Sequence, residues 1–119
     1  MSASITIHGI RNCSTMHKAC AWLDERGVSY AFHDYKVAGI DRETLDTWVR
    51  KVDWETLLNK AGMTFRKLPE NDKAGLDVAK AIMLMQASPS MIKRPVLEID
   101  GALLVGFRPA EYEAAFGPG

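Results

Sequence analysis

Apolar and polar residues alternate at the start of the chain and then take up the spacing of a helix. Ile5 and Ile7 flank a polar residue, and this period of two predicts a strand over residues 4–8. Residues 9–12 follow as a short loop. From position 14 onward the apolar residues lie three and four positions apart, on one face of a helix: Met16, Ala19, Cys20 and Leu23. Gly27 is the expected C′ residue at the end of this helix.

A second strand is expected over residues 28–35, which completes a strand–helix–strand unit. Such units favour a parallel strand pair joined by a right-handed crossover. The middle of the chain has helical spacing, with Asp41 as the expected N-cap of one helix and Asp53 of a shorter one. Residues 62–69 break the helical pattern, and a further helix is expected from about Lys73 to Gln86.

Strand patterns return towards the C-terminus. Residues 95–99 and 102–106 are joined by Asp100 and Gly101, a pair that favours a tight two-residue hairpin turn. Pro109 is expected at the first position of a short last helix.

The element order βαβ, helices, ββα is that of an α/β, thioredoxin-like fold with a mixed four-stranded sheet. We therefore expect residues 1–119 to form a single domain with a helical insertion at about residues 40–90. Periodicity alone also allows other α/β layouts, because it does not fix the order of strands in a sheet.

Composition narrows the class of protein. With 119 residues, 47% hydrophobic and 25% charged, the chain is typical of one globular domain. Its 15 basic and 15 acidic residues provide no overall attraction to nucleic acid or to an anionic membrane. Residues 1–4 do not resemble a signal peptide, and no apolar run approaches the ~20 residues of a membrane span. Two cysteines are too few for a disulfide framework, so we expect a cytoplasmic protein.

Cys13 lies between the first loop and the first helix, where its thiol meets a helix N-terminus. The partial positive charge and unpaired N–H groups there favour a thiolate. They can lower a cysteine pKa from about 8.5 to roughly 3.5–7.5. Ser14 and Thr15 add hydroxyl donors, and Arg11 and Lys18 add positive charge. The alternative is an inert buried cysteine, which agrees less well with these polar neighbours.

Cys20 lies seven positions after Cys13, about 10 Å along the helix axis. A disulfide needs Cα atoms within about 7 Å, so the two cysteines are not expected to pair. Cys20 is on the apolar stripe and is expected to pack in the core. Met16 occupies the position of the second cysteine of a CxxC motif. The predicted site is therefore monothiol and needs an external thiol to complete a redox cycle.

Five stretches of the sequence, taken in order, form a specific pattern: Ile10–Ala19, Leu57–Lys60, Thr64–Leu68, Ile92–Pro95 and Val105–Phe107. Together they resemble the active-site loop and later motifs of the arsenate reductase (ArsC), Spx and YffB family, over nearly the whole chain. Residues 32–37 add a similarity to the YffB-like branch, whose members are described as glutathione-dependent thiol reductases.

The resemblance implies a role for several side chains. Cys13 matches the nucleophile, and Pro95 matches a cis-proline that faces it. Three arginines match those that surround the oxyanion in arsenate reductases: Arg66, Arg94 and Arg108. A guanidinium group binds an oxyanion or carboxylate with paired hydrogen bonds. The full set expected to bind substrate or glutathione is Arg11, Asn12, Ser14, Thr15, Arg66, Arg94, Pro95 and Arg108.

The resemblance implies a glutathione-dependent thiol-disulfide oxidoreductase with Cys13 as its single nucleophile. An arsenate reductase coupled to glutathione or glutaredoxin is the main alternative. A regulator of the Spx kind, which binds RNA polymerase, is disfavoured by Met16, because Spx proteins usually carry a CxxC switch. A glutathione-binding module with little turnover is a further alternative. We expect glutathione as co-substrate, a mixed disulfide or an oxyanion as substrate, no bound cofactor, no nucleic-acid or membrane partner, and a monomer. The three histidines lack metal-ligand spacing, so no metal is expected.

Overall fold

The structure is a computed structural model that describes residues 5–116. The chain divides into two compact units: a sheet unit, made of the segments up to Asp34 and from Arg94 onward, and a helical unit, Tyr35–Lys93. The expected helical insertion at about residues 40–90 and the assignment of the whole chain to one domain stay predictions. Residues 1–4, for which no signal peptide was expected, lie outside the described residues.

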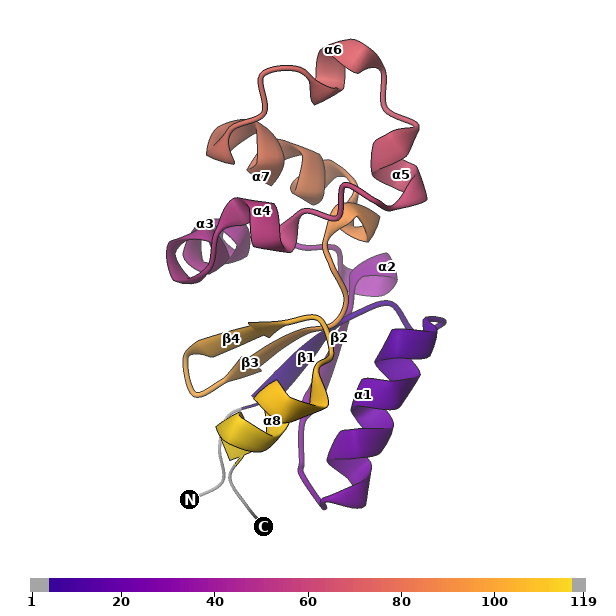
Figure 1. The fold of residues 1–119 in the computed structure, drawn as a ribbon, viewed down its shortest axis with the longest axis vertical. Helices are drawn as coiled ribbons and strands as arrows, with labels where there is room; N and C mark the ends of the chain where they lie inside the picture. The colour runs from indigo at the N-terminus through magenta and orange to yellow at the C-terminus, as the bar shows by residue number, and fades with distance from the viewer. Residues whose placement is uncertain (1–4, 117–119) are drawn as a thin grey trace. The chain divides into compact units, whose positions relative to one another are not determined.

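The strands of the sheet unit are β1 (Ile5–Gly9), β2 (Ala31–Asp34), β3 (Val96–Ile99) and β4 (Ala102–Val105). They form one mixed four-stranded sheet in the order β2-β1-β3-β4 (Figure 1). β1 pairs in parallel with β2 and antiparallel with β3, and β3 pairs antiparallel with β4. The predicted parallel pair, C-terminal hairpin and thioredoxin-like α/β class are all confirmed.

The turn between β3 and β4 has the backbone that the sequence predicted. Asp100 has a φ of 48° and Gly101 a φ of 85°. Tight hairpins with two central residues at positive φ match the right-handed twist of the strands, and Asp-Gly is a favoured sequence for them.

Helix α1 (Ser14–Glu25) connects β1 to β2 and ends at the predicted glycine. Gly27 has a φ of +66°, and its N–H donates to Asp24 O at 3.1 Å. The next N–H, that of Val28, donates to Leu23 O at 3.0 Å, which completes a Schellman cap. Because Val28 belongs to this cap, β2 starts later than the predicted residue 28.

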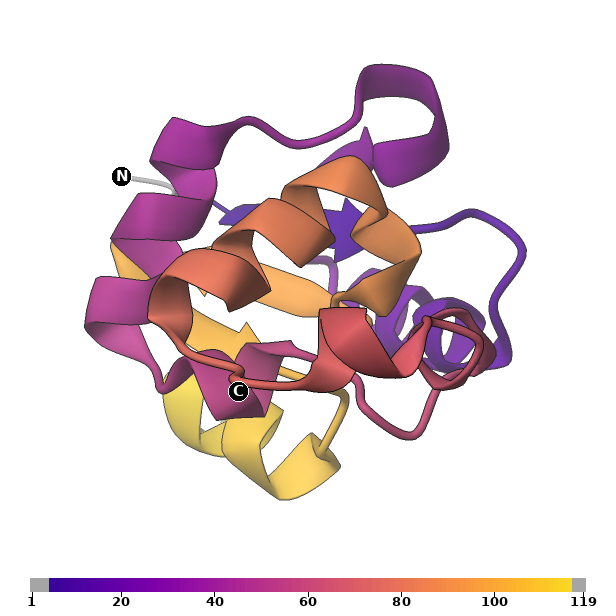
Figure 2. The same ribbon diagram turned by 90° about the horizontal axis from the view of Figure 1, so that it is seen from above.

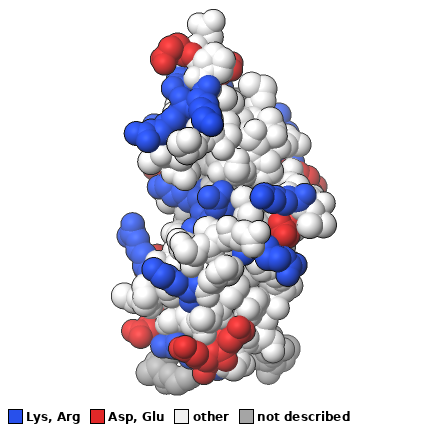
Figure 3. Space-filling view, turned by 90° about the vertical axis from the view of Figure 1, so that its right-hand side faces the viewer, with Lys and Arg blue, Asp and Glu red and all other residues white. Residues whose placement is uncertain are grey.

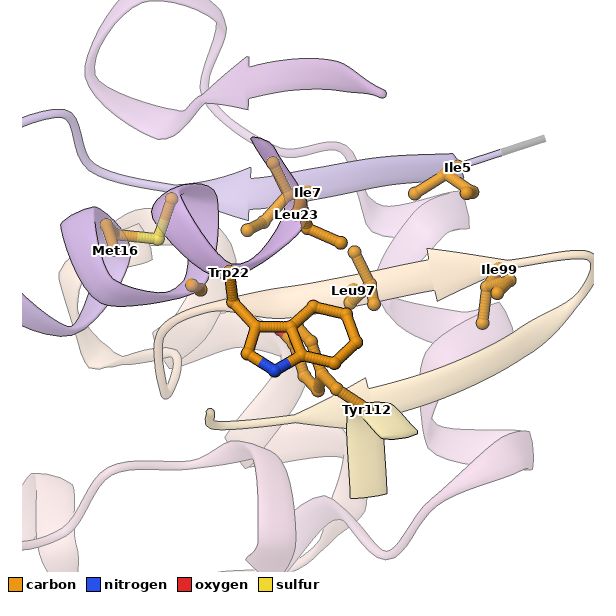
Figure 4. Packing of buried hydrophobic residues seen from close by; sticks show 9 residues of the cluster. Ile5, Ile7, Met16, Trp22, Leu23, Leu97, Ile99 and Tyr112 are labelled. Atoms are coloured by element: carbon orange, nitrogen blue, oxygen red, sulfur yellow. The ribbon is translucent and has the colours of Figure 1, made fainter. Parts of the chain in front are cut away.

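The core of the sheet unit lies on the sheet face that α1 and α8 (Pro109–Phe116) cover (Figures 1 and 4). Pro109 is the first residue of α8, as predicted. Trp22 of α1 and Tyr112 of α8 meet edge to face, with ring centroids 5.4 Å apart. The buried residues of this core are Ile5, Ile7, Met16, Ala19, Trp22, Leu23, Leu97, Ile99 and Tyr112. Burial of these side chains fixes the start of α1 relative to the end of β1.

The helical unit consists of short helices and one 3₁₀ turn. They are α2 (Tyr35–Ala38), α3 (Arg42–Lys51), α4 (Trp54–Leu57), α5 (Met63–Arg66), α6 (Glu70–Lys73), α7 (Val78–Ala87) and η1 (Pro89–Met91). α3 packs against α7 (Figure 2). Asp41 is the N-cap of α3, as predicted, and its Oδ1 accepts a hydrogen bond from Thr44 N at 2.8 Å.

Two predictions in the helical unit were wrong. The expected helix from about Lys73 to Gln86 is interrupted by Gly75, whose φ of +62° cannot continue a helix, and α7 starts after the new N-cap Asp77. Residues 62–69 contain α5, a single turn too short to show a period. Asp53 is the N-cap residue of α4, as predicted, although its side chain makes no capping hydrogen bond. None of the helices between residues 5 and 116 is long and apolar enough to cross a membrane.

Candidate active site

Cys13 is the N-cap residue of α1, directly after the loop that follows β1. Its backbone is extended, with φ −141° and ψ 127°, and its carbonyl accepts the first helical bond from His17 N at 3.0 Å. The side chain is half-buried and packs beside the core. Cys13 therefore retains access to solvent, as a nucleophile requires.

The surroundings of Cys13 favour its thiolate. Partial burial raises the pKa of the Cys13 thiol, but the backbone N–H groups of Met16 and Thr15 and the guanidinium of Arg94 lower it by more, so the pKa lies below its ordinary value. The sulfur makes no capping hydrogen bond of standard geometry. The stabilisation therefore comes from several donors and a positive charge near the sulfur rather than from one bond.

Arg94 acts on Cys13 from the segment that leads into β3. The Arg94–Pro95 peptide bond is cis, as the resemblance implied. Pro95 is buried, and its carbonyl accepts a hydrogen bond from Gly106 N at 2.8 Å. Arg94 is thus anchored by the central strand that follows it, and its half-buried side chain belongs to the same unit as Cys13.

Met16 fills the position of the second cysteine of a CxxC motif and is buried, with 1% of its surface exposed. It packs against the end of β1. A Cβ atom on Gly9 would lie 2.3 Å from Met16 Sδ. The loop that leads to Cys13 therefore follows a position where any side chain larger than that of glycine would collide with Met16.

We expect Gly9→Ala to destabilise the protein by about 1–3 kcal/mol, the usual cost of adding a methyl group to a packed site. Urea unfolding of both proteins measures this change. The matched control is Gly9→Ala combined with Met16→Ala, where the space for the methyl group is restored. The combined loss should be smaller than the sum of the single losses, and strictly additive losses would contradict the contact.

The predicted residues beside Cys13 differ in exposure: two lie in the loop before it and two begin α1. Arg11, Asn12 and Ser14 are exposed, and Thr15 is half-buried with its N–H acting on the Cys13 sulfur. The Arg11 guanidinium lies 3.9 Å from Asp34 Oδ2 and 5.5 Å from the centre of a phenyl ring of β2. A role for these side chains in binding substrate or glutathione stays a prediction.

The other two predicted arginines are both exposed. Arg108 lies in the sheet unit, 3.5 Å from Glu111 Oε2. Arg66 ends α5 in the helical unit, and its carbonyl accepts a hydrogen bond from Lys73 Nζ at 2.8 Å. Arg94 lowers the pKa of Cys13, and anion binding by the three arginines stays a prediction. Both charge signs occur on the face drawn in Figure 3, in keeping with the balanced composition.

Cys20 is a second free thiol, half-buried on α1. The pKa of Tyr30 is raised, mainly by burial and to a smaller extent by the neighbouring Cys20 and Asp24. The Tyr30 hydroxyl donates a hydrogen bond to Asp24 Oδ1 at 3.1 Å. Cys20 packs against the core, as its place on the apolar stripe predicted.

Sequence analysis missed two histidine contacts. His8 is buried, and its Nε2 lies 2.5 Å from Glu98 Oε1 on β3. His17 Nε2 is 3.0 Å from Arg11 O, in the loop before Cys13. The alternation of β1 already placed His8 on a sheet face, but no sequence pattern marks a side chain that bonds back to a loop carbonyl. Within residues 5–116, no three histidine, cysteine or acidic side chains are grouped closely enough to hold a metal ion.

Comparison with known proteins places the chain in a family. A solved structure named YffB is 59% identical, has a TM-score of 0.94 and covers 96% of this chain and 100% of its own. An arsenate reductase (ArsC) related protein from Brucella melitensis is 58% identical, with a TM-score of 0.77 and coverage of 99% and 98%. The global transcriptional regulator Spx of Streptococcus mutans is 25% identical over 112 residues, which are 92% of this chain and 81% of Spx. The ArsC family model matches residues 8–115, so this chain belongs to the ArsC family.

Proposed function

We propose that the chain is a thiol-disulfide oxidoreductase that uses Cys13 as its single nucleophile and glutathione as its co-substrate. Membership of the ArsC family supports an oxidoreductase related to arsenate reductases. The observation that carries the proposal is the lowered pKa of Cys13 at the N-terminus of α1, beside Arg94. A thiolate is the form of cysteine that attacks sulfur.

The reaction needs one protein thiol and two glutathione units. The Cys13 thiolate attacks the glutathione sulfur of a mixed disulfide, so that a Cys13–glutathione bond forms while the original S–S bond breaks. The other half leaves as a thiolate and takes up a proton from water. A free glutathione thiolate then attacks the glutathione sulfur on Cys13, which forms oxidised glutathione and returns the Cys13 thiolate.

Met16 supports the choice of an external reductant. Intramolecular resolution of the Cys13 adduct requires a second thiol within disulfide distance, and position 16 carries a buried thioether instead. Glutathione, alone or through a glutaredoxin, supplies this second thiol. Arg94 is proposed to hold a carboxylate of glutathione or a charged oxygen of the substrate, with Arg66 and Arg108 as further proposed anion ligands.

Arsenate reduction is the second candidate, favoured by the similarity to the arsenate reductase related protein of Brucella melitensis. In that reaction the Cys13 thiolate attacks arsenic and an arsenate oxygen leaves as water. Two glutathione thiols then supply the two electrons that reduce arsenic(V) to arsenic(III), which forms one oxidised glutathione and returns the Cys13 thiolate. A regulator of the Spx kind finds support in the sequence similarity to Spx, but Met16 leaves no partner for a Cys13 disulfide switch.

A coupled assay tests these functions. The mixed disulfide of glutathione and 2-mercaptoethanol is incubated with the protein and glutathione, and oxidised glutathione is followed through NADPH consumption by glutathione reductase. The same assay with arsenate, with and without a glutaredoxin, forms the second arm. We expect protein-dependent turnover of the mixed disulfide. A Cys13–glutathione adduct by mass spectrometry without turnover would instead indicate a binding module, and binding of RNA polymerase subunits in a pull-down would indicate the regulator.

A further inference from the structure

The loop between β1 and α1 sets the backbone of Cys13. Ile10 is the first residue of this loop and is buried, with 9% of its surface exposed, whereas Arg11 and Asn12 are exposed. The position of the sulfur relative to α1 depends on the ψ and χ1 torsions of Cys13, and the loop restrains ψ because the preceding peptide group moves with it. A contact that restrains the loop therefore also restrains the position of the Cys13 sulfur relative to the N–H groups of α1.

His17 contacts this segment at two points. Its backbone N–H donates to Cys13 O at 3.0 Å, as the first turn of a helix requires. Its side-chain Nε2 lies 3.0 Å from Arg11 O, two residues before the N-cap. Because a carbonyl oxygen can only accept, Nε2 must carry the proton. The first turn of α1 is thereby closed back onto the loop.

We propose that His17 is a positioning residue for Cys13: its imidazole N–H holds the carbonyl of Arg11 and so fixes the loop that carries the reactive sulfur. The proposal rests on the proposed function only for its effect on turnover. Its effect on the ionisation of Cys13 follows from the geometry alone.

Arg11 makes two further contacts from this loop, one with the Asp34 carboxylate and one with the Phe32 ring, whose centre is 5.5 Å away. The Arg11 guanidinium is 3.9 Å from Asp34 Oδ2, and its side chain is 78% exposed. The Asp34 side chain is 11% exposed, but 3.9 Å is too long for a hydrogen bond of standard geometry, so this pair does not fix one arrangement of the loop. The hydrogen bond from His17 to the Arg11 carbonyl is shorter than the Arg11–Asp34 contact, and it joins the backbone of the loop to α1. It therefore restrains the loop more tightly.

The contact does not depend on the charge of His17. Neutral imidazole with the proton on Nε2 and the imidazolium both donate from that atom. Glutamine places an amide N–H at a similar reach and should keep the contact, whereas leucine removes the donor and keeps most of the volume. The pair of variants therefore separates hydrogen bonding from packing.

The experiment measures the rate of Cys13 alkylation by iodoacetamide against pH in Cys20→Ser backgrounds, so that one thiol reports. His17→Leu should raise the midpoint by roughly half a pH unit and lower the glutathione-dependent kcat/KM about three- to tenfold, the scale of one lost hydrogen bond. His17→Gln should remain close to the parent. Ala21→Leu, which also adds an exposed leucine on α1, should change neither quantity.

Three results would overturn the proposal. They are an unchanged midpoint in His17→Leu, an equal shift in His17→Leu and Ala21→Leu, or a loss in His17→Gln as large as in His17→Leu. Urea unfolding of each variant checks folding, and His17→Ala replaces the leucine variant if that one does not fold. If the parent protein shows no turnover with any disulfide, the proposed function fails, but the alkylation midpoints still decide the role of His17.

Discussion

Cys13→Ser should abolish the glutathione-dependent reduction of a mixed disulfide, with a fall in kcat of at least about a thousandfold. The reason is chemical: a serine hydroxyl at the same N-cap does not ionise near neutral pH, and an oxygen cannot form the mixed disulfide that carries the reaction. The fold should survive, because serine is a favoured N-cap residue and Cys13 is half-buried.

Cys20→Ser is the matched control for this variant. It removes the second free thiol from the same helix and should retain most of the activity, although the loss of packing against the core lowers stability. Mass spectrometry after incubation with oxidised glutathione should show one adduct in Cys20→Ser and none at position 13 in Cys13→Ser. Retention of a tenth or more of the activity in Cys13→Ser would disprove the nucleophilic role.

Arg94→Met should raise the pKa of Cys13 and lower kcat/KM about ten- to a hundredfold. The guanidinium lowers the pKa of the thiol. Methionine keeps much of the side-chain volume without the charge, so part of the thiolate population is lost at neutral pH. Removal of an opposite charge near an ionisable group disfavours its charged form. Loss of a charge-assisted contact to the substrate accounts for the rest of the expected fall.

The sign of the pH effect follows from the direction of the shift. With its pKa below the ordinary value, wild-type Cys13 is a thiolate at a pH where an ordinary cysteine, with a pKa of about 8.5, is still protonated. Activity is therefore present above the pKa of folded Cys13 and is lost as the pH falls through it. Any stability gained from ionisation is fully present above the pKa of the unfolded thiol and is lost as the pH falls through the folded pKa. In Arg94→Met both losses should occur at higher pH.

Arg94→Lys separates charge from geometry. Lysine keeps the positive charge but cannot form two parallel hydrogen bonds, so the alkylation midpoint should stay near the wild-type value while KM for glutathione rises. An Arg94→Met protein with an unchanged alkylation midpoint would show that the helix N-terminus alone determines the thiolate, and that Arg94 serves another purpose.

The sequence predicted the features that depend on local chemistry. The period of two around Ile5 and Ile7, the C′ glycine at position 27 and the N-cap Asp41 each leave a local pattern, and each is confirmed. The short helices α5 and α6 were missed because four residues make about one turn, which is too few for a period to show.

In the candidate site, too, the features with a local sequence pattern were predicted from that pattern and those that join distant residues were not. The placement of Cys13 at a helix N-terminus followed from the sequence, because strand, loop and helix are contiguous there. The action of Arg94 on that thiol joins residues far apart in the chain, so only the resemblance to a family implied it. The bond from His17 to a loop carbonyl was not predicted, because a backbone acceptor has no side-chain identity that a sequence could display.

The sheet order has a consequence for synthesis on the ribosome. β1 is a central strand that pairs with β2 on one edge and with β3 on the other, and the whole helical unit, Tyr35–Lys93, is encoded between these two partners. At a translation rate of about 5–20 residues per second, β1 waits roughly 3–12 s for its second neighbour. During this interval the nascent chain presents an unpaired strand edge beside an incomplete core, which is the period when a chaperone or a neighbouring nascent chain has the best opportunity to bind it.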